Sequence, residues 1–522
     1  MQNKSRDPYS RFDDVPSEAE KKAKVKKIAI IVAVVLVAIV AVVLGLVFGL
    51  KKKPPVDVIK MESKNNNYCF AMKESDDTFT IPMDIFEGND PDAFDVDIKV
   101  IKNNIKLEKN VVTVINKLPE ESEGSYGLGE IIFKKNDDVY VRVYIQILRK
   151  DVIEVDSYSS LVAIPEGANG TYLQTKDINL EGKELLIKAF KGTYYGNHNK
   201  LIGLDVSANG GLFLNPSGAT LRGINLVDFK YDKKDASTGN KSIGLLANGM
   251  NAVDLVGVKV KGEIIYSSSV IDSSRVINVG GIAGYSENAV LNDIEIKGCE
   301  SDVNIKVSAS GQALHIGGLI GNARNAFIEE SKSFGKVEYS YSNEGTNSVY
   351  LGGIVGFLKG RVDTYVHAQP LDMGWFFESS SNILVNVKND SIKFCIGGIV
   401  GKMVDYQLHD VIFNGKIDID CVNSEVNAGN IVGEVENKVF APDTEKGILI
   451  TQITIKNSIK VSSDGHLRLG SIIGASKSQT VAERYGIACR NFSNTPLADI
   501  TRKSEAGKSK ETWNKQQIGV VG

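Results

Sequence analysis

The chain has 522 residues, and its 61 Lys and Arg nearly balance its 64 Asp and Glu, which gives a net charge of −3 at pH 7. This balance provides no basic field, so we expect no nucleic-acid partner. The five cysteines form no CxxC pair, which argues against a zinc or thiol-redox site, and we expect no metal and no cofactor.

The chain begins with a polar segment, residues 1–27, which predicts a cytoplasmic tail. Residues 28–50 then carry no charge and no proline. At about 1.5 Å per residue this run is roughly 35 Å long, enough to cross a bilayer. It is longer than the core of a signal peptide and ends in Lys51, Lys52 and Lys53, so it predicts a transmembrane helix and an integral membrane protein.

Lysines set the expected orientation of this helix. Lys21, Lys22, Lys24, Lys26 and Lys27 precede it, and only three lysines follow it directly. The bias predicts a single-pass type II protein of the cell membrane, with a cytoplasmic N-terminus and an extracellular C-terminal region.

Residues 56–162 alternate apolar and polar side chains between polar turns, which predicts a small β-sandwich that serves as a stalk domain. An immunoglobulin-like arrangement fits the strand spacing, although the Cys…Trp…Cys core of antibody domains is missing. The acidic stretch from Glu87 to Asp97 lacks the spacing of an EF-hand loop, and we interpret it as a solvated turn.

Six pentapeptides of similar composition recur between residues 280 and 474. Their starts lie 32–45 residues apart, a period typical of stacked or radial repeat proteins. The repeat glycines are the pairs Gly280 and Gly281, Gly317 and Gly318, Gly352 and Gly353, and Gly397 and Gly398, followed by the single leading glycines Gly429 and Gly470.

The residues around each glycine pair predict how one repeat folds. The preceding strand alternates apolar and polar residues, as in Ile316 and His315, and a turn-forming residue such as Asn325 stands eight residues after the first glycine. The missing Cβ allows the backbone to bend or to approach its neighbour. We expect a mainly β fold, a right-handed parallel β-helix over residues 163–485 with a C-terminal cap over 486–522.

A β-propeller is the alternative, because kelch-type blades also carry a double glycine. Those blades are about 50 residues long and share a recurrent Trp. This chain has only Trp375 and Trp513, at no fixed offset from the glycines, so the β-helix is favoured.

The pentapeptides, together with an opening segment over residues 170–226, resemble the GLUG-motif repeats of many cell-surface proteins. The resemblance covers residues 163–474 and implies a parallel β-helix with an adhesin-like role at the cell surface. The HExxH zinc motif that accompanies this repeat in some bacterial IgA peptidases is absent from this chain.

No catalytic motif stands out, and we expect a non-catalytic protein that binds a host-cell, matrix or glycan ligand or acts as a structural rod. The alternative is a surface-tethered carbohydrate-active enzyme of the polysaccharide lyase or hydrolase kind, which would use clustered carboxylates. The candidate pairs are Asp418 with Asp420 and Asp293 with Glu295.

The remaining candidate sites are glycosylation sequons, one aromatic loop and the thiols. The sequons are at Asn169, Asn240, Asn389 and Asn491, and the predicted binding loop between Gly356 and Gly397 holds Tyr365, Trp375, Phe376 and Phe377. We expect five buried free thiols rather than a disulfide such as Cys395 with Cys421.

Overall fold

A computed structural model of the chain describes residues 66–119, 126–149, 151–272, 274–288, 295–341, 348–360, 375–387, 392–437, 449–478, 488–493, 499–501 and 517–521. The expected tail and transmembrane segment lie outside these ranges. Within them, no helix is long and apolar enough to cross a membrane. From residue 64 onward the chain forms one compact unit.

The first part of this unit consists of two small sheets that share one apolar core. The four-stranded sheet has the order β1 (Asn66–Lys73), β7 (Asp138–Leu148), β6 (Gly129–Lys135) and β3 (Asp95–Lys99). The three-stranded sheet has the order β2 (Thr78–Thr80), β5 (Val111–Val114) and β4 (Ile105–Glu108). Three short 3-10 helices lie between these strands, η1 (Glu74–Asp76), η2 (Met83–Phe86) and η3 (Pro91–Ala93). We call these residues, 66–148, the N-terminal domain.

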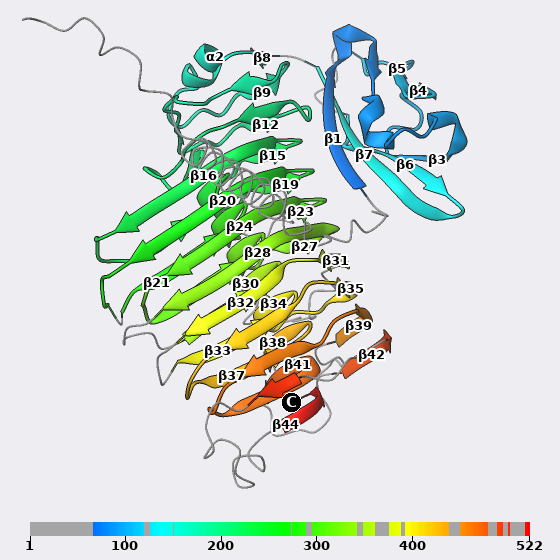
Figure 1. Cartoon of the computed structure of the whole chain (residues 1–522). Helices are drawn as coiled ribbons and strands as arrows, with labels where there is room; N and C mark the ends of the chain where they lie inside the picture. Colours follow the sequence, from blue (N-terminus) through cyan, green and yellow to red (C-terminus); the bar gives the residue numbers. More distant parts are fainter. Residues whose placement is uncertain are drawn as a thin grey trace, which may run out of the picture. The chain divides into compact units, whose positions relative to one another are not determined.

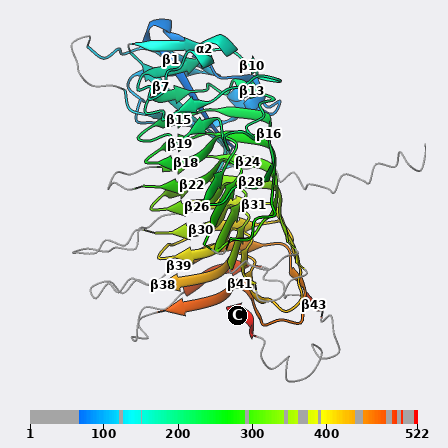
Figure 2. The same cartoon turned by 90° about the vertical axis from the view of Figure 1, so that its left-hand side faces the viewer.

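The rest of the unit is a stack of parallel strands, shown from two sides in Figures 1 and 2. Each turn of the chain, or rung, adds strands to several sheets, and these strands pair with their counterparts in the next rung. The seven-stranded sheet has the order β27 (Phe327–Glu329), β23 (Glu295–Lys297), β19 (Asp254–Val256), β15 (Thr220–Arg222), β12 (Thr193–Tyr195), β9 (Thr171–Gln174) and β8 (Val152–Val155).

The second sheet has 14 strands. Its main path is β10 (Ile178–Asn179), β13 (Lys200–Ile202), β16 (Asn225–Asp235), β20 (Lys259–Ser268), β24 (Glu300–Ser308), β28 (Ser331–Tyr341), β31 (Trp375–Ser379), β35 (His409–Phe413), β39 (Leu449–Ile455) and β42 (Ala488–Ser493). Beside the later strands run β32 (Asn382–Val387), β36 (Ile417–Asp420), β40 (Ile459–Ser462) and β43 (Asp499–Thr501).

The third sheet has 16 strands and holds both sides of every glycine corner. The strands before the glycines are β17 (Lys241–Ile243), β21 (Val276–Gly280), β25 (Ala313–Gly317), β29 (Ser348–Gly352), β33 (Lys393–Gly397) and β37 (Glu425–Gly429). The second series starts with β11 (Ile187–Lys188) and β14 (Phe213–Leu214). It continues with the strands after the glycines, β18 (Ala247–Asn251), β22 (Ala283–Glu287), β26 (Ile320–Arg324), β30 (Val355–Lys359), β34 (Val400–Val404) and β38 (Val432–Asn437). The two series join through β41 (Leu467–Ser478), which β44 (Gln517–Val521) pairs.

This pairing confirms a mainly β fold of long parallel sheets, consistent with a β-helix or solenoid, and it rules out a propeller of separate antiparallel blades. One apolar core runs through the stack from Val155 to Ile473. The stack starts before the expected boundary at residue 162, because β8 pairs with β9 and the short helix α2 (Tyr158–Val162) packs Leu161 into the same core.

The glycine pairs are required by space rather than by a left-handed backbone. A Cβ placed on Gly353 would overlap the carbonyl oxygen of Gly398 in the next rung and the hydroxyl of Ser379 across the core. A Cβ on Gly398 would overlap the carbonyl oxygen of Asn430 and would lie 2.5 Å from the ring of Phe413. The glycine that ends the pentapeptide is equally confined, since a Cβ on Gly401 would lie 2.6 Å from the carbonyl oxygen of Gly356 in the preceding rung.

We therefore expect Gly353→Val and Gly398→Val each to destabilise the stack by about 1–3 kcal/mol or more, because the added side chain meets backbone that cannot move aside. Thermal melts of the purified protein measure the effect. Gly249→Ala is the matched control, because the nearest atom to its added Cβ is 3.9 Å away, in Tyr285. Equal melting temperatures for all three variants would contradict the packing argument.

Candidate functional site

The two carboxylates expected to form a pair lie on the outer face of the 14-stranded sheet. Asp418 and Asp420 alternate along β36 with Ile417 and Ile419, which are buried in the core. Because successive side chains of a strand point to opposite faces, both aspartates face outward. Asp418 is half-buried and Asp420 is exposed.

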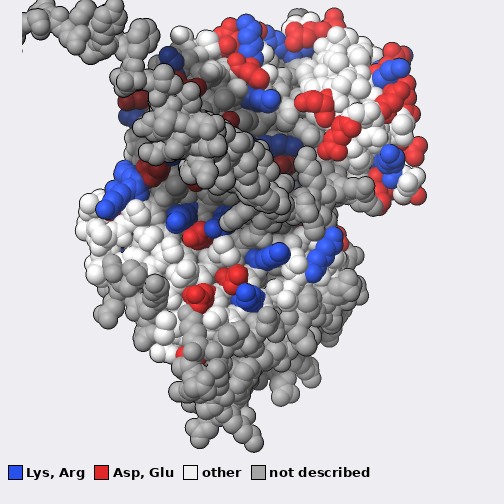
Figure 3. Space-filling model, viewed as in Figure 1, with Lys and Arg blue, Asp and Glu red and all other residues white. Residues whose placement is uncertain are grey.

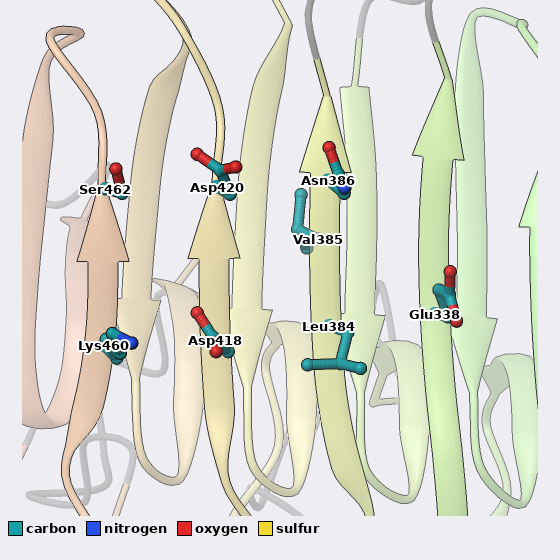
Figure 4. Close-up of a pocket in the computed structure, with 8 residues that line it drawn as sticks. All are labelled: Glu338, Leu384, Val385, Asn386, Asp418, Asp420, Lys460 and Ser462. Carbon is teal, nitrogen blue, oxygen red and sulfur yellow. The ribbon is translucent and has the colours of Figure 1, made fainter. Parts of the chain in front are cut away.

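Neighbouring strands place two rows of side chains beside these aspartates (Figure 4). Lys460 is the register partner of Asp418, and Ser462 is the partner of Asp420. On the other side, Leu384 is opposite Asp418 and Asn386 is opposite Asp420. With Glu338 and Val385 they line a hollow of about 510 Å³.

This hollow fits binding better than acid–base chemistry. A carboxyl that acts as a general acid normally lies in an enclosed apolar environment that raises its pKa. Asp420 is instead exposed, and the row of Asp418 holds a lysine and a leucine. Figure 3 shows acidic and basic side chains interspersed on the described surface in that view rather than gathered into one field.

The second candidate pair is not brought to this hollow. Glu295 lies in β23, on the seven-stranded sheet, and Asp293 lies outside the described residues. Burial raises the pKa of Glu295 above its ordinary value. Glu295 therefore lies on a different sheet of the stack from Asp418 and Asp420.

The prediction of an aromatic loop is wrong for three of its four residues. Trp375, Phe376 and Phe377 belong to β31, which pairs with β28 on one side and β35 on the other. β31 thus connects β28 to β35 in the 14-stranded sheet, although apolar and polar residues do not alternate at Trp375, Phe376 and Phe377. Tyr365 lies outside the described residues.

The sequons have different positions in the fold. Asn169 and Asn240 are exposed, and the side-chain carbonyl of Asn240 accepts a hydrogen bond from the backbone of Val276 at 2.8 Å. Asn491 belongs to β42, and Asn389 lies outside the described residues.

The thiols agree with the expectation at the positions that can be compared. Cys69, Cys299, Cys395 and Cys421 are buried and form no disulfide, so the alternative pairing of Cys395 with Cys421 does not occur. Burial raises the pKa of Cys69 and of Cys299 to about 12, which keeps both thiols protonated at neutral pH.

The sequence interpretation missed a ladder of side chains at the glycine corners. In each pentapeptide, one such side chain lies two residues before the first glycine and one lies five residues after it. We call this set of side chains the corner ladder. They are Asn278, His315, Tyr350, Cys395, Asn427 and Arg468 on the first strands, and Tyr285, Asn322, Phe357, Lys402, Glu434 and Ala475 on the second. A constant offset from the glycines was the signal that could have found them.

Rings occupy the middle of the corner ladder. His315 stacks on Tyr350 and on Phe357 with 5.2 Å between ring centroids in each case. Burial lowers the pKa of His315 to about 3, so the ring is neutral at ordinary pH. Because these rings stack on one another along the stack, their faces serve the protein's own packing rather than a ligand.

Ions occupy the C-terminal part of the corner ladder. Glu434, whose side chain is fully buried, pairs with Lys393 at 2.7 Å, with Lys402 at 3.0 Å and with Lys477 at 3.5 Å. Asn427 donates a further hydrogen bond to it at 2.9 Å. Burial alone would raise the pKa of Glu434, but the hydrogen bond from Lys393 and the charge of Lys402 hold it at about 2.

No protein-family model matches the chain, and no curated protein matches it. Within the described ranges, no group of three or more His, Cys, Asp or Glu side chains is placed to hold a metal ion.

We expect Glu434→Gln to lower the free energy of unfolding at pH 7 by about 1–3 kcal/mol, because it removes the buried charge that Lys393, Lys402 and Lys477 share. Since the folded-state pKa of Glu434 is depressed, its contribution is complete above the ordinary pKa of about 4.3 and is lost as the pH falls toward 2. Urea unfolding at pH 7 and at pH 3 measures the difference between variant and wild type, which should shrink at pH 3.

The control for this measurement is Asp302→Asn. Asp302 forms an exposed ion pair with Lys261 at 3.8 Å, so its loss should cost about 0–1 kcal/mol. If Glu434→Gln lowers the free energy of unfolding equally at both pH values, the destabilisation does not come from the charge of Glu434.

Proposed function

We propose that this chain is a membrane-anchored cell-surface protein whose right-handed parallel β-helix binds a ligand without catalysis. The observation that carries the proposal is the unbroken 14-stranded sheet, which offers one long outer face. Stacked repeat proteins use such extended surfaces to bind other macromolecules. The GLUG-like pentapeptides support a location at the cell surface.

The anchor in this proposal is the apolar run over residues 28–50, with residues 1–27 in the cytoplasm. The N-terminal domain supports the expected immunoglobulin-like sandwich: its strands divide into β3, β6 and β7 in one sheet and β2, β5 and β4 in the other. This division corresponds to the C, F, G and B, E, D strands of immunoglobulin domains, with β1 joined to the edge of the first sheet.

The ligand class that fits best is a host-cell, matrix or glycan molecule that carries polar groups of both signs. Around the hollow on β28, β32, β36 and β40, three carboxylates lie beside a lysine, a serine and an asparagine. Such a mixed set donates and accepts hydrogen bonds over a short distance, as recognition of sugar hydroxyls or a polar protein surface requires.

A second candidate, a carbohydrate-active enzyme, is favoured by the same two aspartates. Alternate residues of one strand lie about 7 Å apart, which is within the separation of roughly 6.5–9.5 Å found in inverting glycosidases. The exposed position of Asp420 and the lysine opposite Asp418 make this the weaker candidate.

The topology has a direct test. An external protease applied to intact cells should digest the chain beyond Lys53 and leave the N-terminal tail intact, because only the C-terminal side would be outside. An epitope tag at each end reports the outcome on a blot. A C-terminal tag that survives on intact cells and is lost after permeabilisation would reverse the assignment.

Binding is tested with the full-length protein in lipid nanodiscs on arrays of matrix proteins and glycans. We expect Asp418→Asn with Asp420→Asn to weaken binding by about tenfold, the equivalent of 1.4 kcal/mol, without changing the melting temperature. The control Lys188→Gln, an exposed residue of β11, should leave binding unchanged. If the wild type degrades a polysaccharide and the double substitution abolishes this activity, the chain is instead a carbohydrate-active enzyme.

A further inference from the structure

Strand β1 of the N-terminal domain crosses the stack at a column of left-handed corners. Each corner joins a strand of the seven-stranded sheet to the next strand of the 14-stranded sheet. Successive corners have positive φ at Asn197 (54°), Gly223 (58°), Gly257 (64°), Gly298 (62°) and Glu330 (50°). The column therefore repeats one backbone shape from rung to rung.

The two faces of β1 have different partners. Tyr68, Phe70 and Met72 point into the core of the N-terminal domain. The alternate residues Asn67, Cys69 and Ala71 are also buried, and they face the corners. A strand that is buried on both faces links two cores, and side chains as small as Cys and Ala allow the backbones to approach closely.

Three of these left-handed corners are glycines, and each leaves no room for a side chain beneath β1. A Cβ on Gly223 would overlap the carbonyl oxygen of Cys69, and a Cβ on Gly257 would lie 2.8 Å from Cys69 Cβ. A Cβ on Gly298 would lie 2.7 Å from Asn67 Cβ. These glycines thus satisfy two demands at once, the left-handed φ and the close approach of β1.

Polar bonds hold β1 at one end of the column. The side-chain amide of Asn197 donates to the carbonyl oxygen of Ala71 at 2.9 Å and accepts from the amide of the same residue. The side chain of Asn197 thus forms hydrogen bonds with both backbone groups of Ala71, as the backbone of a neighbouring strand would. The ring of Tyr68 meets His198 edge-on at 5.0 Å, and Lys259 lies 4.0 Å above the ring of Tyr68.

At the other end of the column the contacts come from β7, the neighbour of β1. Tyr144 donates its hydroxyl hydrogen bond to Glu330 at 2.7 Å, and Arg142 forms an ion pair with the same carboxylate. Further along β7, the carbonyl of Gln146 accepts from Arg222 at 3.3 Å. The face formed by Asn67, Cys69 and Ala71 of β1 with Arg142, Tyr144, Gln146 and Leu148 of β7 is called the docking face below.

We propose that the docking face is a lateral clamp, which joins the N-terminal domain and the rungs from β12 to β27 into one cooperative unit. In a solenoid each repeat contacts only its neighbours, so opening spreads from rung to rung. A strand that crosses the corners from Asn197 to Glu330 couples rungs that do not touch each other. The N-terminal domain then acts as a stabiliser of this half of the stack rather than as a free stalk.

Hydrogen exchange of the full-length protein tests the clamp, because exchange reports the opening of each strand separately. The variant Ala71→Leu enlarges the docking face without changing the stack. We expect amides of β1 and of β12, β15, β19, β23 and β27 to exchange at least tenfold faster together, while those of β36 and β37 keep their rates. Val96→Thr, at an exposed position of the same domain, is the control.

A gentler pair of changes covers the case in which Ala71→Leu unfolds the N-terminal domain. Tyr144→Phe removes one hydroxyl, and Glu330→Gln removes its acceptor charge. Each variant should accelerate hydrogen exchange in both the N-terminal domain and the strands β12 to β27. In the double variant, the change in the free energy of opening should be smaller than the sum of the two single changes. Acceleration confined to the N-terminal domain, or strictly additive effects, would overturn the proposal.

Discussion

The structure depends on the close approach of backbones at the glycine corners. In a parallel stack, each rung repeats the path of the rung before it at a spacing of about 4.8 Å. Any atom added at Gly353 or Gly398 therefore meets not a flexible side chain alone but the carbonyl oxygen of the following rung. Absence of Cβ at these positions permits the turn, and the turn permits one core to continue from Val155 to Ile473.

The in-register pairing of successive rungs also restricts where charged side chains can stand. Residues in equivalent positions lie directly above one another, so like charges in successive rungs would repel. One column of the 14-stranded sheet alternates instead, through Lys259, Glu300, Lys332 and Glu378. The first two pair at 3.3 Å and the last two at 3.6 Å. Burial lowers the pKa of Lys332, and the adjacent glutamates oppose this shift. A slip by one rung would place like charges in contact, so the column favours one order of rungs.

The sequence predicted the parts of this fold that depend on local repetition. The period of the pentapeptides and the alternation around residues such as Ile316 and His315 predicted parallel rungs and a shared core, and the structure confirms both in its long parallel sheets. The alternation of Asp418 and Asp420 with Ile417 and Ile419 agrees with the outward direction of the two aspartates in the structure. β31 was missed because its run of aromatic residues has no alternation, and its strand geometry comes from pairing with β28 and β35.

The docking face could not be found in the sequence for a different reason. Arg142 and Tyr144 alternate with apolar residues along β7, and this pattern is typical of a strand with one face in water. In the structure both side chains contact Glu330, which is 186 and 188 positions later in the chain than Tyr144 and Arg142. Contacts between segments so far apart leave no periodic trace in one sequence. The glycines at Gly223, Gly257 and Gly298 did carry a signal, but a left-handed corner alone explains it.

Two separate devices thus tie non-neighbouring parts of the stack together. The docking face crosses the corners from Asn197 to Glu330. The buried Glu434 joins three successive rungs, because it pairs with Lys393 and Lys402 of the rung before it and with Lys477 of the rung after it. Between them, adjacent rungs are held mainly by backbone pairing and apolar contact, which specify spacing but tolerate fraying. A long sheet face can serve as a binding surface only if its strands keep their relative positions. The hollow around Asp418 and Asp420 lies on β32, β36 and β40, whose rungs include those of β33 and β37 next to the Glu434 network. The device that acts on the rungs of this hollow is therefore the buried charge of Glu434 rather than the N-terminal clamp.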